Sequence, residues 1–403
     1  MKTPHEYWIY RFLLSIFSPI MLVWALKEAW QQKNWLWLRQ RLGLVAPASV
    51  DIWVHCASVG EVNAAAPLIQ ACIAKQKRIH ISCFTPTGIE QVKRHFVNTA
   101  YLSYSALPLD WGWTVHNFLH RLHCQQLWLV ETELWPTLIE QAHQRGIEIS
   151  MINGRLSKKT LNTPHWWRRL LASLIEYKMR RCILRNENDK LDFMTLGVNE
   201  NKLSIGGNLK YCDPITPTKA PLISVPYILL ASSHHPEEIT LAQLWQQHPE
   251  LPKLVIVPRH PKRRVSLGQQ FLAAKIPFQL RSETDEVLPN GILISDTFGE
   301  LQAWISHASL VIMGGSFVEK GGQNPLEAAK IGKKVLCGQD MSDFIEEMTL
   351  LTQLGLLTQY PDMPTLMLDI HHQITRAQSV HHHEQLLMLK NKILRYYVDA
   401  LCR

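Results

Sequence analysis

Residues 51–61 read DIWVHCASVGE, a short apolar run followed by Ser58, Gly60 and Glu61. An apolar run bounded by polar and turn-forming residues is typical of a buried strand, and the pattern after it predicts a helix over residues 58–75. The same alternation of strand and helix recurs downstream, which predicts a parallel, doubly wound sheet. The further strands expected in this sheet are Arg78–Phe84, Gln126–Val130 and Ile147–Ile152.

A second alternating series begins at residue 227. The turn-rich stretch before it, residues 207–226, carries four prolines and predicts a linker. We therefore expect an α/β protein with two Rossmann-like domains, residues 46–206 and 227–378, and a C-terminal helix over residues 379–403. Two such domains enclose a cleft, and a ligand is expected at the carboxyl ends of their strands. The strands expected in the second domain are Tyr227–Ala231, Lys253–Val257, Gly291–Ile294, Ser309–Met313 and Lys334–Cys337.

The N-terminal residues 1–45 combine apolar, basic and aromatic character. Residues 12–26, FLLSIFSPIMLVWAL, carry no charge, and as a helix they are about 22 Å long, shorter than the roughly 30 Å hydrocarbon core of a bilayer. No small-residue cleavage site follows this run, so it predicts an uncleaved membrane anchor, shallow or spanning. A surface helix docked on its own domain is the alternative. The basic residues after the run predict a cytosolic location for the rest of the chain.

The chain has 403 residues and a formal net charge of +8. Its 46% hydrophobic and 19% charged residues are ordinary for a globular protein, which argues against disorder and against a membrane protein with many spans. The basic excess indicates an anionic partner, either lipid or nucleic acid. It is strong in residues 158–181, where basic residues flank Trp166 and Trp167, a combination that suits a lipid headgroup surface.

Cysteine and histidine occur without the spacing of a metal site. None of the eight cysteines forms a C-x-x-C pair, so we expect buried thiols in a reducing compartment rather than a zinc or redox motif. The tract His381–His383 is interpreted as a solvated helix end. The sequence holds no P-loop and no strand-linked G-x-G-x-x-G, which argues against a P-loop NTPase and against a typical dinucleotide-binding oxidoreductase.

Acidic residues follow two of the expected strands. Ser58 and Glu61 have the spacing of a capping box, in which Glu61 would accept from the backbone N–H of Ser58. A carboxylate at this strand end is equally suited to act as a general base. Glu131 and Glu133 follow the third strand. A single carboxylate is enough to complement a helix dipole, so the presence of two leaves a functional role open as the alternative.

Cations and glycines follow other strands. Arg155 in the turn after the fourth strand and Lys210 in the linker are suited either to an anion or to solvent. Arg259 lies in VPRHPKRR, residues 257–264, where its guanidinium group suits a phosphate.

Two glycine pairs, in residues 314–317 and 321–322, precede a helix whose expected N-cap is Asn324, with Pro325 at its first position. Backbone amides at such a helix start bind phosphate.

Eight of these motifs, in this order, resemble the 3-deoxy-D-manno-octulosonic acid (Kdo) transferases of lipopolysaccharide synthesis. They are HCASVGE, TPTG, ETELWP, NGRLS, GNLK, VPRHP, DTFGEL and GGSFxxxGGQNPLE, and the likeness extends to RQRLG at residues 39–43 and the apolar N-terminus. The resemblance implies an inverting glycosyltransferase of the GT-B fold. It would move Kdo from CMP-Kdo to a lipid A precursor (lipid IVA) at the cytoplasmic face of the inner membrane and release CMP.

The resemblance also implies roles for individual residues. Glu61 matches the general base of the family, and Glu131 and Lys210 match residues assigned to transition-state stabilisation. Phe298 stands where methionine is common in the family, and Gln323 where histidine is common. The residues implied to bind the CMP of the donor are Pro258, Arg259, Phe298, Gly299, Glu300, Asn324, Pro325, Leu326 and Glu327.

The implied reaction needs no cofactor, since CMP-Kdo is itself a substrate. A CMP-sugar carries one phosphate and the sequence has no D-x-D motif, so we expect transfer without a metal. The expected partners are the donor, the lipid A precursor and anionic inner-membrane lipid, and not nucleic acid. The alternatives are another nucleotide-sugar enzyme of the same fold, such as a lipid A disaccharide synthase or a sugar 2-epimerase, and a noncatalytic membrane- or nucleic-acid-binding module.

Overall fold

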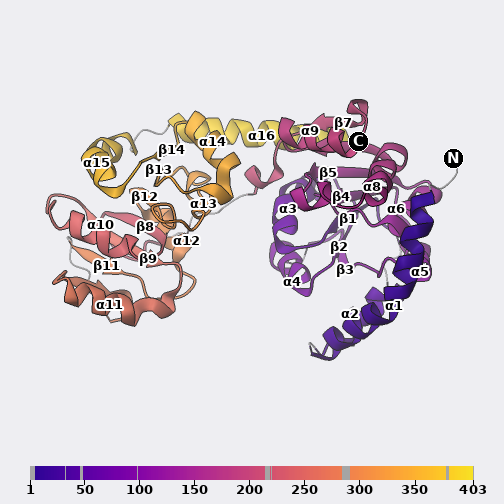
Figure 1. Cartoon of the computed structure of the whole chain (residues 1–403), viewed down its shortest axis with the longest axis horizontal. Coiled ribbons are helices and arrows are strands. Elements are labelled where there is room, and N and C mark those ends of the chain that lie inside the picture. Colours follow the sequence, from indigo (N-terminus) through magenta and orange to yellow (C-terminus); the bar gives the residue numbers. More distant parts are fainter. Residues whose placement is uncertain are drawn as a thin grey trace. The chain divides into compact units, whose positions relative to one another are not determined.

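The chain divides into two α/β units (Figure 1). Unit 1 comprises the chain up to Asp213 together with the stretch from Asn391, and unit 2 comprises Pro214–Lys390. A computed structural model describes residues 5–31, 33–45, 49–97, 99–213, 218, 220–283, 291–377 and 381–402.

Unit 1 is built on a seven-stranded sheet in which all neighbouring strands pair in parallel, with the order β3-β2-β1-β4-β5-β6-β7. The expected parallel, doubly wound sheet is confirmed, and every strand predicted for it is present. Its strands are β1 (Ile52–Cys56), β2 (Ile79–Cys83), β3 (Leu102–Ala106), β4 (Gln126–Val130), β5 (Glu148–Gly154), β6 (Met179–Leu184) and β7 (Leu203–Ile205).

The helices of unit 1 alternate with these strands, and two more precede them. Helix α3 directly follows β1, as predicted, and carries Glu61 in its first turn. The helices are α1 (His5–Gln31), α2 (Trp35–Arg41), α3 (Val59–Ala74), α4 (Pro86–His95), α5 (Gly112–Arg121), α6 (Pro136–Gln144), α7 (Lys158–Leu161), α8 (His165–Lys178), α9 (Glu187–Leu196) and the short 3-10 helices η1 (Glu200–Lys202) and η2 (Leu209–Tyr211).

Unit 2 repeats this architecture with the strand order β10-β11-β9-β8-β12-β13-β14, again parallel throughout. Central strand β8 is buried along its whole length, whereas the edge strand β10 is only partly buried. The strands are β8 (Tyr227–Ser233), β9 (Lys253–Pro258), β10 (Phe278–Leu280), β11 (Ile292–Ile294), β12 (Leu310–Met313), β13 (Val335–Cys337) and β14 (Leu357–Gln359). The expectation of two doubly wound domains is therefore confirmed.

The helices of unit 2 are short apart from the last two. They are α10 (Glu237–Trp245), α11 (Arg264–Ala273), α12 (Leu301–His307), α13 (Leu326–Ala329), α14 (Ile345–Gln353), α15 (Met363–Ala377) and the first part of α16 (His381–Leu401), with the 3-10 helices η3 (Pro261–Arg263), η4 (Arg281–Glu283) and η5 (Ser342–Phe344).

The end of α16 returns to unit 1. The hydroxyl of Tyr397 accepts from the backbone N–H of Asn153 at 3.2 Å and donates to the carbonyl of Gly207 at 3.0 Å. A Cβ atom at Gly206 would lie 2.8 Å from the Tyr397 ring, so only glycine admits this approach. The segment that follows β7 is thus fixed to unit 1 by the C-terminal helix.

The prediction that the cysteines are free thiols is confirmed for six of them and wrong for two. Cys72 on α3 and Cys402 are joined by a disulfide, because α16 brings the end of the chain against α3. Such a contact between distant parts of the chain leaves no local signal in the sequence. The other six cysteines are free, and all but Cys124 are buried.

Helix α1 is longer than the uncharged run that predicts it. It has 27 residues, which makes it about 40 Å long, enough to cross a bilayer. Among the described residues it is the single helix long and apolar enough to do so. Several of its large apolar side chains are mostly exposed, including Phe12, Ile20 and Val23. These side chains are available to lipid, as an anchor requires.

Candidate active site

The candidate catalytic residues of unit 1 lie where its strand order reverses. Strand β1 is central: β2 and β3 follow it on one side, and β4 and the later strands lie on the other. Ligands of open α/β sheets bind outside the carboxyl ends of the strands at such a switch point. Glu61 lies just after β1, and Glu131 and Glu133 just after β4, so the fold places all three carboxylates at this position.

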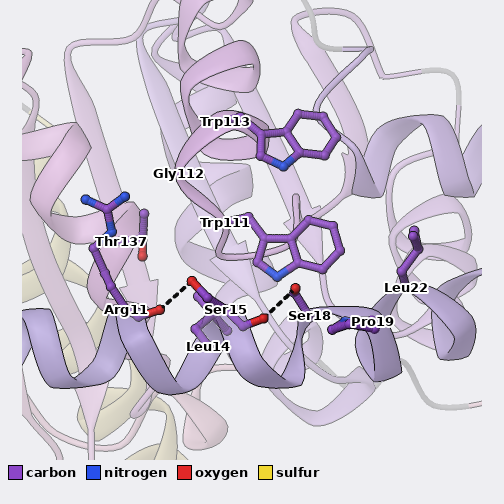
Figure 2. A pocket seen from close by; sticks show the side chains of 10 residues that line it. All are labelled: Arg11, Leu14, Ser15, Ser18, Pro19, Leu22, Trp111, Gly112, Trp113 and Thr137. Atoms are coloured by element: carbon purple, nitrogen blue, oxygen red, sulfur yellow. Dashed lines mark hydrogen bonds between the residues drawn. The ribbon is translucent and has the colours of Figure 1, made fainter.

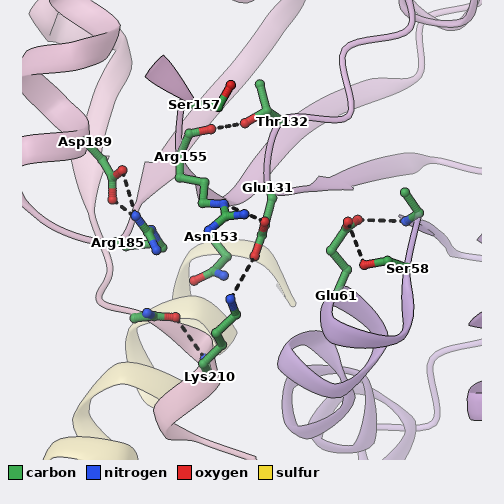
Figure 3. Close-up of polar contacts among 12 residues, drawn as sticks. Ser58, Glu61, Glu131, Thr132, Asn153, Arg155, Ser157, Arg185, Asp189 and Lys210 are labelled. Carbon is green, nitrogen blue, oxygen red and sulfur yellow. Dashed lines mark hydrogen bonds and ion pairs between the residues drawn. The ribbon is translucent and has the colours of Figure 1, made fainter. Parts of the chain in front are cut away.

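Glu61 is 8% exposed and receives two hydrogen bonds (Figure 3). Oε2 accepts from the backbone N–H of Ala57 at 2.7 Å, and Oε1 accepts from the hydroxyl of Ser58 at 3.1 Å. Ser58 makes no side-chain capping bond. The capping box that the spacing allowed is therefore not formed. The carboxylate accepts from the N–H of Ala57 instead of that of Ser58, and the Ser58 hydroxyl donates to the carboxylate instead of capping the helix.

The pKa of Glu61 is raised to about 8. Burial is the largest cause, and repulsion from Glu133 and, more weakly, Glu131 adds to it, while the hydrogen bonds from Ala57 and Ser58 oppose it. Gly60 leaves open space beside this turn, since a Cβ atom there would meet only Oγ of Ser58, at 3.9 Å. A carboxyl group with a pKa near the working pH and an open approach is suited to general-base catalysis.

Glu131 lies between two cations (Figure 3). Its Oε2 atom is 2.8 Å from Nε of Arg155, which follows β5, and its Oε1 atom is 3.6 Å from Nζ of Lys210 in η2. The backbone of Glu131 is left-handed, with a φ of 56°, a conformation that non-glycine residues adopt rarely. The structure thus brings together three residues from separate sequence motifs.

Lys210 is positioned by two asparagines. The side-chain oxygen of Asn208 accepts from the backbone N–H of Lys210 at 3.1 Å, and that of Asn153 accepts from the N–H of Leu209 at 2.9 Å. Asn153 lies near the carboxyl end of β5, two residues before Arg155. The linker lysine is therefore part of unit 1, fixed at the same sheet edge as Glu131, and is not a solvated hinge residue.

The side chain of Glu133 contacts different residues from that of Glu131. Its Oε2 atom accepts from the indole N–H of Trp135 at 2.9 Å and lies 3.5 Å from Nε2 of His55. His55 is fully buried in β1, and its Nδ1 atom lies 3.0 Å from the carbonyl and from the hydroxyl of Ser82. Sequence reasoning did not single out His55, although a histidine inside an otherwise apolar strand was the available signal.

The residues implied to bind CMP lie at the carboxyl edge of the sheet in unit 2. Pro258 ends β9 and Arg259 follows it, while Phe298, Gly299 and Glu300 follow β11 and precede α12. Arg259 is exposed and Phe298 is 74% exposed, so both side chains are available to a ligand. Gly299 has a φ of 81°, a backbone conformation that favours glycine.

The third group of these residues, Asn324–Glu327, follows β12. Helix α13 begins at Leu326 with Pro325 as its N-cap, one residue later than predicted. The side-chain oxygen of Asn324 accepts from the N–H of Leu326 at 3.1 Å. Glu327 retains exposed surface, although partial desolvation raises its pKa against the opposing effects of Lys330 and Arg259.

In the glycine-rich turn after β12 the backbone N–H groups of residues 315–317 are already bound by a carboxylate, whereas the phosphate site predicted at the helix start near Asn324 stays a prediction. The carboxylate of Glu237 accepts from the backbone N–H groups of Gly315 (2.8 Å), Ser316 (3.1 Å) and Phe317 (3.0 Å), and from that of His234 (2.8 Å). Glu237 is buried at the start of α10, directly after β8. It lies at the switch point of unit 2, and no role was predicted for it from the sequence.

The basic segment 158–181 is partly neutralised. Arg169 pairs with Glu6 of α1 at 3.3 Å, Lys178 pairs with Glu140 at 3.2 Å, and Arg180 pairs with Glu148. The ring of Trp167 packs against Tyr10 of α1, with centroids 5.6 Å apart. Part of the surface that the sequence assigned to lipid therefore docks α1, although Lys158 and Lys159 remain exposed on α7.

One group of possible metal ligands occurs among the described residues. His248, Glu250 and His371 each offer a ligand atom within 4.8 Å of the others, and all three have exposed surface. His248 and Glu250 precede β9, so they lie at the amino edge of the sheet in unit 2. The group is therefore at the opposite edge from the candidate site residues.

Two α/β units, each built on a parallel sheet, define the GT-B fold class. A solved structure of UDP-GlcNAc 2-epimerase from Neisseria meningitidis bound to UDP-GlcNAc shares this fold, with a TM-score of 0.56 at 14% identity, covering 87% of this chain and all of that one. Within this class, the family described as 3-Deoxy-D-manno-octulosonic-acid transferase (kdotransferase) matches residues 37–212.

The 3-deoxy-D-manno-octulosonic acid transferase of Haemophilus influenzae is 32% identical over 372 residues, which cover 85% of this chain and 84% of that protein. The transferase of Bordetella pertussis is 27% identical over 384 residues, covering 89% of both chains. The chain therefore belongs to the family of 3-deoxy-D-manno-octulosonic acid transferases.

Proposed function

We propose that this protein is a Kdo transferase that moves Kdo from CMP-Kdo to a lipid A precursor, lipid IVA, and releases CMP. The observation that carries the proposal is the buried carboxyl group of Glu61, whose pKa is raised to about 8 at the switch point of unit 1, in a chain of this family.

Glu61 is the proposed general base. A sugar hydroxyl is a weak nucleophile, so a carboxylate must take its proton as the oxygen attacks the anomeric carbon of Kdo. The attack comes from the side opposite the leaving CMP, and the anomeric configuration inverts. The two hydrogen bonds to Glu61 hold its oxygens in place, and the open space at Gly60 gives the acceptor hydroxyl an approach.

Lys210 and Glu131 are proposed to stabilise the transition state. CMP leaves as a phosphate monoester, and the negative charge that develops on it needs a cation fixed in advance. Glu131 holds the ammonium group of Lys210 at 3.6 Å and is itself held by Arg155 at 2.8 Å. The role of Glu131 in this arrangement is to orient Lys210.

Unit 2 is proposed to bind the donor. Pro258 and Arg259, the turn Phe298–Glu300 and the segment Asn324–Glu327 follow three strands of one parallel sheet at the same edge. The guanidinium group of Arg259 suits the phosphate of CMP, and the exposed ring of Phe298 suits the cytosine base. Because Glu237 takes the amides of residues 315–317, we assign the phosphate to Arg259 and not to that turn.

Transfer is proposed to be independent of metal ions and cofactors. A single donor phosphate can be neutralised by cationic side chains, as in the arrangement above. Full activity in excess EDTA is the expected result, and loss of transfer that Mg²⁺ restores would contradict it.

We further propose that α1 anchors the enzyme at the cytoplasmic face of the inner membrane. Its exposed apolar residues and the exposed Lys158 and Lys159 suit anionic lipid. The expected result is flotation with phosphatidylglycerol-containing vesicles and none after deletion of α1, with no binding to duplex DNA or RNA in either case.

The decisive experiment is incubation of the full chain with CMP-Kdo and tetraacylated lipid A precursor, with products read by mass. The expected product is the precursor plus Kdo. CMP should inhibit the reaction and UDP should not, which separates a Kdo transferase from UDP-sugar enzymes of the same fold. Transfer from a UDP-sugar with none from CMP-Kdo would contradict the proposal.

A further inference from the structure

Helix α1 is held to unit 1 at both ends and leaves a pocket under its middle. Near its start, the hydroxyl of Tyr10 donates to Oδ2 of Asp110 at 2.7 Å. Near its end, Ala25 and Ala29 are fully buried in a cluster with Trp37. Between these points α1 faces the start of α5 across a pocket of about 740 Å³ (Figure 2). Ligand sites typically have volumes of about 300–1,000 Å³.

The wall that α1 gives to this α1–α5 pocket is apolar in its middle and at its far end, with the charged Arg11 at the end near Thr137. Leu14, Pro19 and Leu22 line it. Two serines also face the pocket, but the hydroxyl of Ser15 donates to the carbonyl of Arg11 and that of Ser18 to the carbonyl of Ser15, both at 2.8 Å. Their protons are thus used within the helix (Figure 2). An apolar ligand is favoured by such a wall.

The wall opposite is made by Trp111 and Trp113 at the start of α5. Trp111 is 9% exposed, and its buried indole N–H has no hydrogen-bond partner. Buried donors are normally satisfied, so an unpaired one beside a cavity indicates a missing acceptor. The ligand therefore combines an apolar body with an acceptor oxygen, as an ester- or amide-linked acyl chain does.

The α1–α5 pocket lies at the same sheet edge as the candidate base. Asp110 and Trp111 follow β3, and Oδ2 of Asp110 accepts from the backbone N–H of Thr137, another lining residue, at 2.9 Å. Trp135, just before Thr137, donates to Glu133, whose charge raises the pKa of Glu61. The pocket and the residues proposed for catalysis therefore lie along the same edge of the sheet in unit 1.

We propose that the α1–α5 pocket holds one acyl chain of the lipid acceptor, with its carbonyl or hydroxyl oxygen on the indole N–H of Trp111. This inference rests on the proposed function. An acceptor drawn from the bilayer along the apolar surface of α1 would place one chain in the pocket and present its sugar at the sheet edge. The pocket is then a specificity site for acylated acceptors.

The test fills the pocket by Gly112→Leu. A Cβ atom at Gly112 meets only the flexible ends of Arg11, at 3.6 Å, and Gln141, at 3.9 Å, so the side chain can enter without a backbone clash. The matched control is Leu191→Phe, which adds volume at an exposed position on α9, outside both the lining and the anchor helix. Kinetics are measured for the full chain in phosphatidylethanolamine–phosphatidylglycerol nanodiscs, with the tetraacylated precursor and with the chemically deacylated one.

Gly112→Leu should raise KM for the tetraacylated precursor about 10-fold or more, because excluding two methylenes already costs about that much affinity. The kcat for the tetraacylated precursor should stay unchanged, as should kcat and KM for the deacylated one. For Leu191→Phe, kcat and KM for both precursors should equal those of the wild type. Trp111→Phe, which removes the donor, should raise the same KM about fivefold.

Equal effects on both acceptors, or none on either, would overturn the inference. Weaker vesicle flotation of Gly112→Leu with an unchanged KM would instead mark the pocket as a site for bilayer lipid and would overturn it too. The wild type distinguishes failure of the proposed function from failure of the pocket assignment. If it transfers no Kdo to either acceptor, the proposed function fails; if it transfers to both with the same KM, only the pocket assignment fails.

Discussion

The ammonium nitrogen of Lys210 lies 3.6 Å from Oε1 of Glu131, although the two residues come from distant motifs. Lys210 belongs to η2 and Glu131 follows β4. The contact exists because η2 is held against unit 1 through Asn153, whose side chain accepts from Leu209, and through the C-terminal helix at Gly207. A lysine fixed this way is available to stabilise negative charge without further reorganisation.

Lys210→Met should lower kcat about 10²-fold and leave the thermal unfolding midpoint nearly unchanged. The first effect follows from losing a preorganised cation. The second follows because partly exposed ion pairs contribute only about 0–1 kcal/mol. Steady-state kinetics and a thermal melt measure both. Lys190→Met is the control, since Lys190 also pairs with a glutamate on the surface of unit 1, at 2.6 Å. A normal kcat for Lys210→Met would exclude the proposed role.

Glu61→Gln should reduce transfer by about 10²–10⁴-fold while the protein stays folded. The amide oxygen of glutamine can still accept from the N–H of Ala57, so the start of α3 keeps its hydrogen bond. Transfer is measured by product mass and folding by circular dichroism. Glu90→Gln, at an exposed position on α4, is the matched control and should be fully active. An unfolded Glu61→Gln protein would instead show that the carboxylate is structural.

The activity should depend on pH through Glu61. A base with a pKa of about 8 is mostly protonated at pH 6, so kcat/KM should rise from pH 6 and level off above pH 8. Glu133→Gln removes a repelling charge and should move this limb to lower pH. Ser58→Ala removes a hydrogen bond to the carboxylate and should move it to higher pH. Shifts in the reverse directions would contradict the assignment of the limb to Glu61.

The same raised pKa has a consequence for stability. Between about pH 4.5 and 8 the folded state keeps a proton on Glu61 that the unfolded state has lost, so the wild type loses up to about 1.4 kcal/mol of stability per pH unit through this group. Glu61→Gln removes this dependence. Urea unfolding at several pH values should show the variant gaining stability relative to the wild type as pH rises through this window. A constant difference would mean that the pKa of Glu61 is not raised.

Much of the fold could be predicted from the sequence, because central strands leave continuous apolar runs. The strands that were missed have a different pattern. Edge strand β3 is half exposed, β6 carries Arg180 and Arg181 among its first residues, and β7, β10 and β14 have three residues each. Their positions depend on pairing with a neighbouring strand, which a single run of residues does not encode.

The candidate site was predictable only as a list of strand-end residues. Parallel strands bring their carboxyl ends to one edge, so Glu61 and Glu131 could be expected near each other. Their individual partners could not: Glu131 pairs with Arg155 and Lys210, whereas Glu133, two residues later, faces His55. Such choices depend on side-chain direction and packing between elements.

Glu237 is another residue whose partners could not be predicted from the sequence. Its replacement should destabilise unit 2. Glu237→Ala leaves four backbone N–H groups without their acceptor, and a buried unsatisfied group costs about 1–3 kcal/mol. We expect a lower midpoint of urea unfolding and weaker CMP binding by calorimetry. Glu237→Gln keeps one acceptor oxygen and should show a smaller loss. An unchanged midpoint for Glu237→Ala would show that the turn at residues 315–317 needs no carboxylate.

The hydroxyl of Tyr10 should control the docking of α1. It donates to Asp110, a carboxyl group that also accepts from the backbone N–H groups of Thr137 and Leu138 at the start of α6. Burial raises the pKa of Asp110 to about 6, and these hydrogen bonds oppose the rise. Tyr10→Phe removes one of them, so the contact that joins α1 to the sheet edge is weakened while the capping of α6 remains.

Hydrogen exchange in nanodiscs should therefore show faster exchange in α1 of Tyr10→Phe and unchanged exchange in α6. Tyr177→Phe, at an exposed position on α8, is the control and should resemble the wild type. If α1 forms one wall of an acceptor site, its loosening should also raise KM for the acylated precursor and leave KM for CMP-Kdo unchanged. Equal protection of α1 in both variants would mean that packing at Ala25 and Ala29, and not the hydrogen bond to Asp110, holds this helix in place.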